Sequence, residues 1–272
     1  MARPLRIEFS GAVYFIVSKG NASQKIFLGS GDATSWLEVF KNVCKRFGWI
    51  CYSYCLMSDR YMIVIETPKP NLSKGMRQLN GIYTQSFNRR HGRDGHVFRG
   101  RYGSVLVQKS KYLADLIKYV LFSPVRSGFV KLPHQFKWSS CKYMLNKEEC
   151  PDWFDKNYVN GLFDDLSTEF SEKADLKEDI LNQITKQVFL GDEKFINDVQ
   201  GYIDKEKDIT EIPKIQRSAL IQQYLNSSDS REIAIARTYL SGDYTLRQLA
   251  DHFSLHYSTV SRIVKDHEQG LL

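Results

Sequence analysis

The order of strands and helices predicted for the first half of the chain limits the folds that it can adopt. Runs of β-branched and aromatic residues predict strands over residues 12–18, 49–56, 61–66 and 104–108. Apolar positions at three- and four-residue spacing predict helices over residues 32–47, 71–88 and 111–122. This β-α-β-β-α-β order predicts an α+β fold, with a ferredoxin-like antiparallel sheet backed by helices.

The composition is that of a folded chain with a sizeable core, since 42% of its 272 residues are hydrophobic. No apolar run approaches the roughly 20 residues that span a bilayer, and MARPLRIEF has no apolar signal-peptide core. We therefore expect no membrane partner and a cytoplasmic location. The five cysteines lack a CxxC pair, which predicts reduced, mostly buried thiols and not a disulfide framework or a zinc ribbon.

Charge divides the chain into three predicted parts. Residues 1–147 hold the predicted sheet, residues 148–230 form a largely helical connector with an acidic start, and residues 231–272 form a small C-terminal module. Between residues 69 and 111, Asp94 is the only acid, and aromatic residues alternate with cations. Because this mixture suits phosphate contacts and base stacking, we predict DNA binding by Lys74, Arg77, Arg89, Arg90, Arg93, Arg99 and Arg101.

Three segments carry a resemblance to a known family: MARPLRIEFSGAVYFIVSKGN, CYSYCLMSDRYMIVIETPKPNLSKGMRQLNGIYTQSFNRRHGRDGHVFRGRYGS and YLADLIKYVLFSPVRSG. They resemble the REP-associated tyrosine transposases, within the single-tyrosine HUH superfamily. The resemblance implies a metal-assisted transesterification on single-stranded DNA with hairpins. A tyrosine hydroxyl attacks a phosphodiester and becomes attached to the 5′ end. Two strand histidines, and an amide one helical turn after the tyrosine, would hold the divalent cation.

Carried over residue by residue, the resemblance places the nucleophile at Tyr119 and replaces every ligand of the metal. The histidine pair falls on Arg60 and Met62, the amide falls on Ser123, and Phe15 stands at the histidine of the first strand. A guanidinium has no lone pair to donate, and a thioether is a poor ligand for a hard cation. We expect no metal or other cofactor here, unless the chain still cuts DNA with Mg²⁺ or Mn²⁺.

Other side chains near these positions are open to more than one interpretation. Tyr119 is either a packed tyrosine with a hydrogen-bonded hydroxyl or the surviving nucleophile. Arg60 should turn toward an acid, a backbone carbonyl or a bound anion, because a partly buried cation needs a partner. His91 and His96 are expected to form hydrogen bonds or to face phosphate, not to bind a metal.

The C-terminal segment TLRQLADHFSLHYSTVSRIVKDHE has the spacing of a helix-turn-helix. Leu249 and Ala250 would lie in the first helix, and Leu255 in the turn. Val260, Ile263 and Val264 would bury the second helix, and Ser254 takes a turn position where glycine is usual. The residues left facing DNA would be Tyr257, Ser258, Thr259, Ser261, Arg262 and Lys265. A plain helical hairpin is the alternative.

These observations leave three functions open. The first is a domesticated, catalytically impaired transposase homologue, in which the N-terminal domain binds hairpin or single-stranded DNA, the C-terminal module binds duplex DNA, and the protein acts in regulation. The second is an active single-tyrosine transposase or nickase that transfers strands through Tyr119. The third is a binder of structured RNA.

Overall fold

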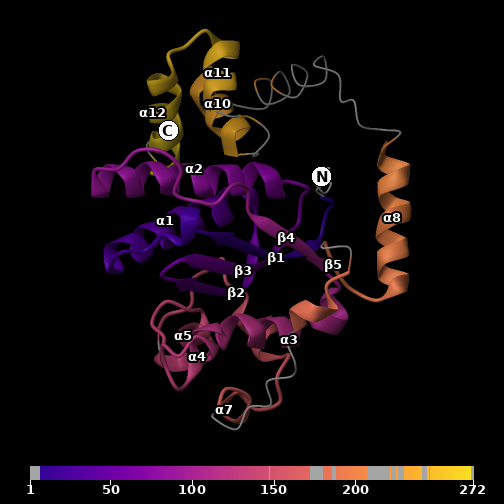
Figure 1. The fold of residues 1–272 in the computed structure, drawn as a ribbon. Helices are drawn as coiled ribbons and strands as arrows, with labels where there is room; N and C mark the ends of the chain where they lie inside the picture. Colours follow the sequence, from indigo (N-terminus) through magenta and orange to yellow (C-terminus); the bar gives the residue numbers. More distant parts are fainter. Residues whose placement is uncertain are drawn as a thin grey trace. The chain divides into compact units, whose positions relative to one another are not determined.

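The computed structural model describes residues 7–146, 148–171, 180–185, 188–207, 221, 225, 230–240, 244 and 246–270. The chain divides into two compact units, Met1–Val199 and Gln200–Leu272, which we describe separately (Figure 1). The division at residues 147 and 230 stays a prediction. In the described ranges, no helix is both long enough and apolar enough to cross a membrane.

A five-stranded sheet in the order β2-β3-β1-β4-β5 forms the centre of the first unit. The strands β1 (Ala12–Lys19), β2 (Ile50–Met57), β3 (Arg60–Thr67) and β4 (Gly103–Val107) lie close to their predicted positions. All pairings among these four strands are antiparallel, with β1 between β3 and β4. This order is that of the ferredoxin-like sheet, so the predicted α+β fold is confirmed.

Helices cover both faces of the sheet (Figure 1). On one face, α1 (Ser30–Phe47) and α2 (Leu72–His91) meet Tyr61, which packs on Trp36 at 4.7 Å between ring centroids and donates to Asn80 at 2.5 Å. On the other face, α3 (Lys109–Leu121) packs on β2 and β3, and Ser123, which follows it, contacts Met62. Consequently both faces of β3 are buried along its middle.

Two glycines end the long helices of the first face. Gly48 follows α1 with a φ of 68°, and Gly92 follows α2 with a φ of 58°. This left-handed backbone costs a residue with a Cβ atom about 1–2 kcal/mol, which glycine avoids. Each glycine amide bonds a carbonyl four residues back, at Cys44 and Asn88.

After α3 the chain forms a series of mostly short elements. They are α4 (Ser123–Arg126), the 3₁₀ turn η2 (Pro133–Gln135), α5 (Cys141–Met144), α6 (Lys156–Asn160), α7 (Leu166–Glu169), η3 (Ile180–Gln183), β5 (Phe189–Leu190) and α8 (Glu193–Lys207). A further 3₁₀ turn, η1 (Asn21–Ser23), follows β1. The strand β5 pairs parallel with β4, so the predicted connector contributes a strand that the sequence does not indicate.

The cysteines follow the prediction. None of the five forms a disulfide, and Cys44, Cys51, Cys55 and Cys141 are buried, while Cys150 is half-buried. Burial raises the pKa of the Cys55 thiol well above its ordinary value, which keeps the thiol protonated and unreactive.

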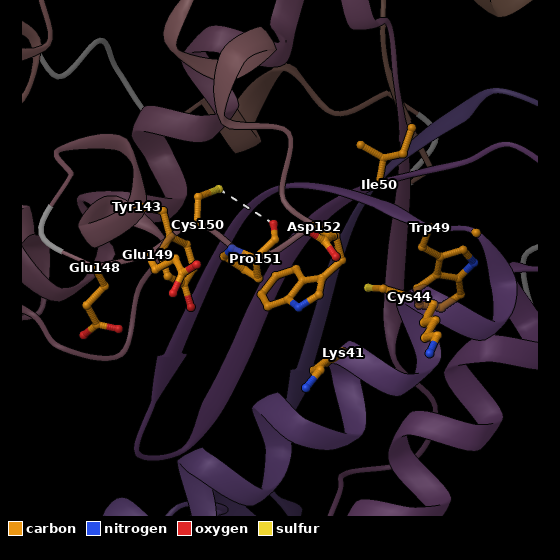
Figure 2. Close-up of a pocket in the computed structure, with 13 residues that line it drawn as sticks. Lys41, Cys44, Trp49, Ile50, Tyr143, Glu148, Glu149, Cys150, Pro151 and Asp152 are labelled. Atoms are coloured by element: carbon orange, nitrogen blue, oxygen red, sulfur yellow. Dashed lines mark hydrogen bonds between the residues drawn. The ribbon is translucent and has the colours of Figure 1, made fainter. Parts of the chain in front are cut away.

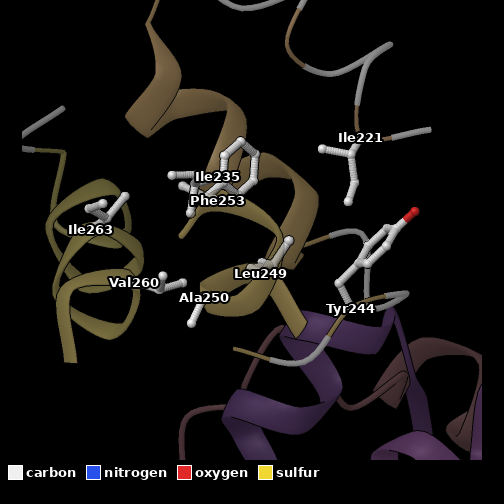
Figure 3. Close-up of a cluster of buried hydrophobic side chains, with 9 residues drawn as sticks. Ile221, Ile235, Tyr244, Leu249, Ala250, Phe253, Val260 and Ile263 are labelled. Carbon is white, nitrogen blue, oxygen red and sulfur yellow. The ribbon is translucent and has the colours of Figure 1, made fainter. Parts of the chain in front are cut away.

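The second unit contains α10 (Arg231–Leu240), α11 (Leu246–Phe253) and α12 (Tyr257–Glu268). Figure 3 shows their apolar side chains, among them Ile235, Leu249 and Val260, converging on one core. Ser254 adopts a φ of 53° in the turn between α11 and α12, where the sequence predicts a glycine-like position. The two helices and the turn thus lie where the sequence places them.

Candidate active site and nucleic-acid interface

Tyr119 lies on α3, a helix whose other apolar residues are buried against the sheet. Its ring is half-buried and meets Phe15 of β1 edge-on, with 6.1 Å between the ring centroids. On its other side, the guanidinium carbon of Arg126 lies 4.1 Å from the ring centroid, and Arg126 Nη2 donates to the Tyr119 carbonyl oxygen. The sequence does not single out Arg126, because its contacts with Tyr119 depend on how the chain turns after α3.

Arg60 pairs with the acid that precedes it. Its Nη2 donates to Asp59 Oδ2 at 2.7 Å and its Nε donates to Asp59 Oδ1 at 3.0 Å, as we expected for a half-buried cation. These hydrogen bonds lower the pKa of Asp59 and raise the pKa of Arg60. Arg60, which stands where the resemblance predicts the first histidine of the pair, therefore forms an ion pair with Asp59.

Met62 and Ser123 contact each other at the remaining ligand positions. The Ser123 hydroxyl donates to the Tyr119 carbonyl oxygen at 2.8 Å and lies 3.7 Å from the Met62 sulfur. Arg126 Nη2 donates to the same hydroxyl oxygen at 2.9 Å. The structure therefore brings together Tyr119, Met62 and Ser123, as the resemblance implies, and adds Arg126.

This donor set does not fit a divalent cation. Arg60 offers a positive charge, Met62 a soft sulfur, and the Ser123 oxygen accepts from a guanidinium. Within the described ranges, no group of three or more His, Cys, Asp or Glu side chains could hold a metal ion. The chemistry available at this site is anion binding and packing.

The predicted basic residues separate into two groups. Lys74, Arg77 and Arg89 are exposed on α2, and Arg99 and Arg101 are exposed in the loop that follows it. Arg93 is half-buried, donates to Gln24 Oε1 at 2.5 Å and lies over the Phe87 ring at 5.6 Å. Arg90 is also bound to neighbours, so these two arginines support the loop as well as carry charge.

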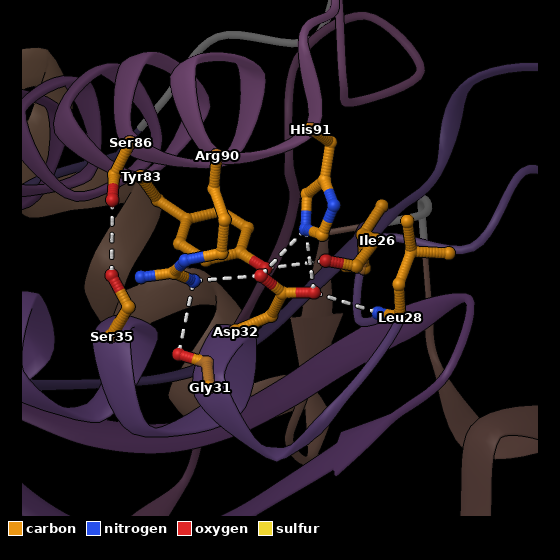
Figure 4. Close-up of polar contacts among 9 residues, drawn as sticks. All are labelled: Ile26, Leu28, Gly31, Asp32, Ser35, Tyr83, Ser86, Arg90 and His91. Atoms are coloured by element: carbon orange, nitrogen blue, oxygen red, sulfur yellow. Dashed lines mark hydrogen bonds and ion pairs between the residues drawn. The ribbon is translucent and has the colours of Figure 1, made fainter.

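Asp32 holds Arg90 and His91 in place (Figure 4). It is 1% exposed at the start of α1, and it accepts from Arg90 at 2.7 Å, from His91 at 2.9 Å and from the Leu28 amide at 2.9 Å. Burial alone would raise the pKa of Asp32, but the hydrogen bonds from His91 and Arg90 outweigh it and lower that pKa. His91 is thus hydrogen-bonded, as predicted, while His96 is exposed in the loop.

Comparison with known proteins shows the family that residues of this chain resemble. The family model described as Transposase IS200 like matches residues 9–121. Residues 9–121 are therefore similar to the IS200-like transposases, and we call them the transposase domain. A Haemophilus influenzae protein with the provisional name REP-associated tyrosine transposase is 21% identical over 155 residues, which are 53% of this chain and 88% of that protein.

A solved structure is also similar to the transposase domain. It is described as a REP-associated tyrosine transposase bound to a REP hairpin, and the TM-score is 0.47 at 14% identity. The match covers 56% of this chain and 89% of the other.

The candidate DNA-facing residues of the second unit lie outside the transposase domain, on and around α12. Tyr257, Ser258, Arg262 and Lys265 are exposed, whereas Thr259 and Ser261 are half-buried. His256 ends the turn before α12. Its Nδ1 accepts a hydrogen bond from the Ser258 amide at 3.3 Å and so caps the N-terminus of α12. Tyr257 and Ser258 lie in the first turn of α12 beside this cap, whereas Lys265 lies in its last turn.

A cleft of about 880 Å³ lies beside the transposase domain's α1, away from Tyr119, which is not among its lining residues (Figure 2). Lys41, Lys45, Trp49 and Trp153 line it together with Glu148, Glu149 and Asp152. The three carboxylates would repel phosphate, so this cleft does not suit DNA.

Proposed function

We propose that this protein is a transposase-like DNA-binding protein, a domesticated homologue that binds hairpin or palindromic DNA and cuts it poorly or not at all. The protein would act in regulation at repeated palindromic sites. It would need no catalytic metal, and it would lie in the cytoplasm, as the sequence predicts. The transposase domain would bind hairpin or single-stranded DNA, and α11 and α12 would bind duplex DNA.

The observation that supports the proposal is that side chains at the predicted metal-ligand positions are engaged in contacts within the protein. Arg60 is paired with Asp59, and Met62 lies against Ser123. A tyrosine hydroxyl has a pKa near 10, so without a metal it is a weak nucleophile at neutral pH. Binding would then remain while cleavage is lost.

Two faces support DNA as the partner. The exposed Arg89, Arg99 and Arg101 can neutralise phosphates, and neutralising phosphates supplies most of the affinity of a DNA-binding protein. In the second unit, Arg262 can reach a guanine edge while Ser258 and Lys265 hold phosphates.

A second candidate function is DNA strand transfer by Tyr119. The specific observation in its favour is that the Tyr119 ring is half-exposed with the guanidinium of Arg126 over its face. Arg60, whose pKa Tyr119 helps to raise, is a second arginine of this site. Guanidinium groups stabilise both a phosphate and a phenolate. Such a site would cut DNA without the metal chemistry of the family.

The test is incubation of the full chain with a single-stranded hairpin DNA, with Mg²⁺, with Mn²⁺ and with EDTA. We expect a retained, salt-sensitive complex and no covalent protein–DNA adduct on a denaturing gel. An adduct that disappears in Tyr119→Phe would replace the proposal with strand transfer. Competition by a matched RNA hairpin separates DNA binding from the RNA-binding alternative, since an RNA binder would prefer the RNA.

A further inference from the structure

Two exposed apolar side chains mark a groove in the first unit. Leu28 is 53% exposed and Phe129 is 55% exposed, and both line a groove of about 250 Å³. The other aromatic residues that line it are Phe27, Phe136 and Trp138, and we call it the aromatic groove. Its volume is below the roughly 300–1,000 Å³ of most small-molecule pockets, so it suits a single ring system.

Backbone hydrogen bonds hold the walls of the aromatic groove together. The Phe27 amide donates to the Ser58 carbonyl at 3.1 Å, and the Leu56 amide donates to the Trp138 carbonyl at 2.9 Å. The Phe129 amide donates to the Pro124 carbonyl at 2.9 Å, which anchors the third wall. The groove is therefore formed before any ligand arrives, which lowers the entropic cost of binding.

The aromatic groove adjoins the Tyr119 site along the chain on two sides. Ser58, which lines the groove, immediately precedes the Asp59–Arg60 pair. Phe129 follows Arg126, whose guanidinium covers the Tyr119 ring, by three residues. The groove and the Tyr119 site therefore draw residues from the same two segments of the chain.

The charge of this segment identifies the kind of ligand. Residues 116–147 contain no Asp or Glu. Lys118 and Lys142 are paired with Glu169 and Glu148. Lys131 and Lys137 are exposed in the segment that supplies Phe129, Phe136 and Trp138 to the groove, and Lys137 Nζ lies 5.2 Å from the centroid of the Trp138 ring. Arg126 is also exposed, three residues before Phe129, and donates to Ser123 Oγ. Aromatic rings for stacking, surrounded by cations for phosphates, form the arrangement with which proteins bind single-stranded nucleic acid.

We propose that the aromatic groove binds one unstacked nucleobase of a single DNA strand, whose flanking phosphates contact Arg126, Lys131 and Lys137. The inference rests on the proposed function, because it assumes that the chain binds DNA. A base in the groove would stack on Phe129, Phe136 or Trp138 whatever its identity, since every base has a π-face. The same surface would hold the strand beside Tyr119.

The experiment compares two fluorescent oligonucleotides of equal length, oligo(dT) and its abasic counterpart, which has the phosphates without the bases. Anisotropy titrations with the full chain give the ratio of the two affinities, which isolates the base contribution. We expect the wild type to prefer oligo(dT). Phe129→Ala should reduce that ratio by about 5- to 100-fold and leave abasic binding unchanged.

Two controls keep the result interpretable. Phe129 is exposed, so its truncation should preserve the fold, which circular dichroism checks. Ile82→Ala removes another exposed apolar side chain, 44% exposed on α2 and outside the groove, and should leave the ratio unchanged. Iodouracil in place of thymine should crosslink to Trp138 or its neighbours, mapped by mass spectrometry.

Equal affinity of the wild type for both oligonucleotides would overturn the inference, as would a ratio that Phe129→Ala does not change. If that variant instead converts a dimer into a monomer at constant ratio, the groove is an interface between copies. Hairpin DNA titrated in parallel separates the two proposals. Retained hairpin binding with an unchanged ratio rejects only the groove, whereas absence of hairpin binding rejects the proposed function.

Discussion

The guanidinium carbon of Arg126 lies 4.1 Å from the centroid of the Tyr119 ring, and the same side chain donates to Ser123 Oγ at 2.9 Å. One arginine therefore joins Tyr119, the predicted nucleophile position, to Ser123, where the resemblance predicts a metal ligand. This contact keeps a positive charge over the face of the Tyr119 ring.

Removal of Arg126 should destabilise the first unit slightly. A cation over an aromatic ring at an exposed site contributes about 0.5–1 kcal/mol, so we expect Arg126→Ala to lower the free energy of unfolding by about 1 kcal/mol. Urea denaturation, monitored by tryptophan fluorescence, measures this free energy of unfolding. Lys131→Ala, an exposed cation of the same segment, is the matched control. Equal effects of the two substitutions would mean that the contact with Tyr119 contributes nothing.

The Asp32 network should make stability sensitive to acid. Because the pKa of Asp32 is lowered in the folded state, its contribution is complete above its unfolded pKa of about 3.9 and is lost as pH falls through the folded value. Asp32→Asn should cost about 2 kcal/mol at pH 7, where hydrogen bonds to a charged acceptor are lost, and less near pH 2. Urea titrations between pH 2 and 7 test this, with the exposed Asp94→Asn as control. A pH-independent cost would contradict the assignment.

The basic residues should contribute unequally to DNA binding. Each of Arg89, Arg99 and Arg101 is exposed, so its replacement by Gln should reduce the salt slope of single-strand binding by about 0.7. Arg90→Gln should also lower stability, because Arg90 is bound to Asp32. Anisotropy at several salt concentrations, with thermal unfolding in parallel, separates the two effects. An unchanged slope in the triple variant would place the DNA-binding face elsewhere.

Arg262 should determine sequence preference on duplex DNA. If it reads a guanine, Arg262→Ala should remove about 1–3 kcal/mol of discrimination between the preferred site and a mutated one. The preferred site is first selected from random duplexes. The preferred duplex and the mutated duplex are then each titrated with the protein. Lys265→Ala, a matched cation one turn further along α12, should weaken all duplexes equally and preserve discrimination. Loss of discrimination in both variants, or in neither, would reject this role.

The turn of the second unit should accept glycine with a gain in stability. Ser254 has a φ of 53°, a backbone that costs a residue with a Cβ atom about 1–2 kcal/mol. Ser254→Gly should therefore raise the stability of this unit by about 1 kcal/mol, less the entropy that glycine adds to the unfolded chain. Ser258→Gly, inside α12, should lower the stability of this unit. Hydrogen exchange of the α11 and α12 amides measures the stability of each variant. A lower stability in both variants would show that the turn is unstrained.

Much of the fold could be predicted because its signals are local. The alternation in residues 61–66 and the glycines after α1 and α2 act within a few residues, so β3 and both helix ends were predicted closely. The strand β5 has only two residues, too few to show a period, and it forms because the backbone of β4 offers it hydrogen bonds. Its presence follows from the sheet and not from its own sequence.

The candidate site also has residues that could be predicted from the sequence and residues that could not. Tyr119, Arg60, Met62 and Ser123 could be aligned by resemblance, because the motif keeps its spacing when its chemistry changes. Asp32 could not be predicted, since its partners Arg90 and His91 are 58 and 59 residues away. Arg126 had no signal either, because its contact with the Tyr119 ring depends on how the chain turns after α3.

The sequence by itself determined the order of strands and helices, the concentration of basic residues and the side-chain chemistry at the predicted ligand positions, because periodicity, charge and donor chemistry belong to individual residues. Only the tertiary structure decided which charges are bound to partners, where Arg126 lies and how the aromatic groove forms. These features depend on segments far apart in sequence whose burial and hydrogen bonds exist only after the sheet and its two helical layers have packed.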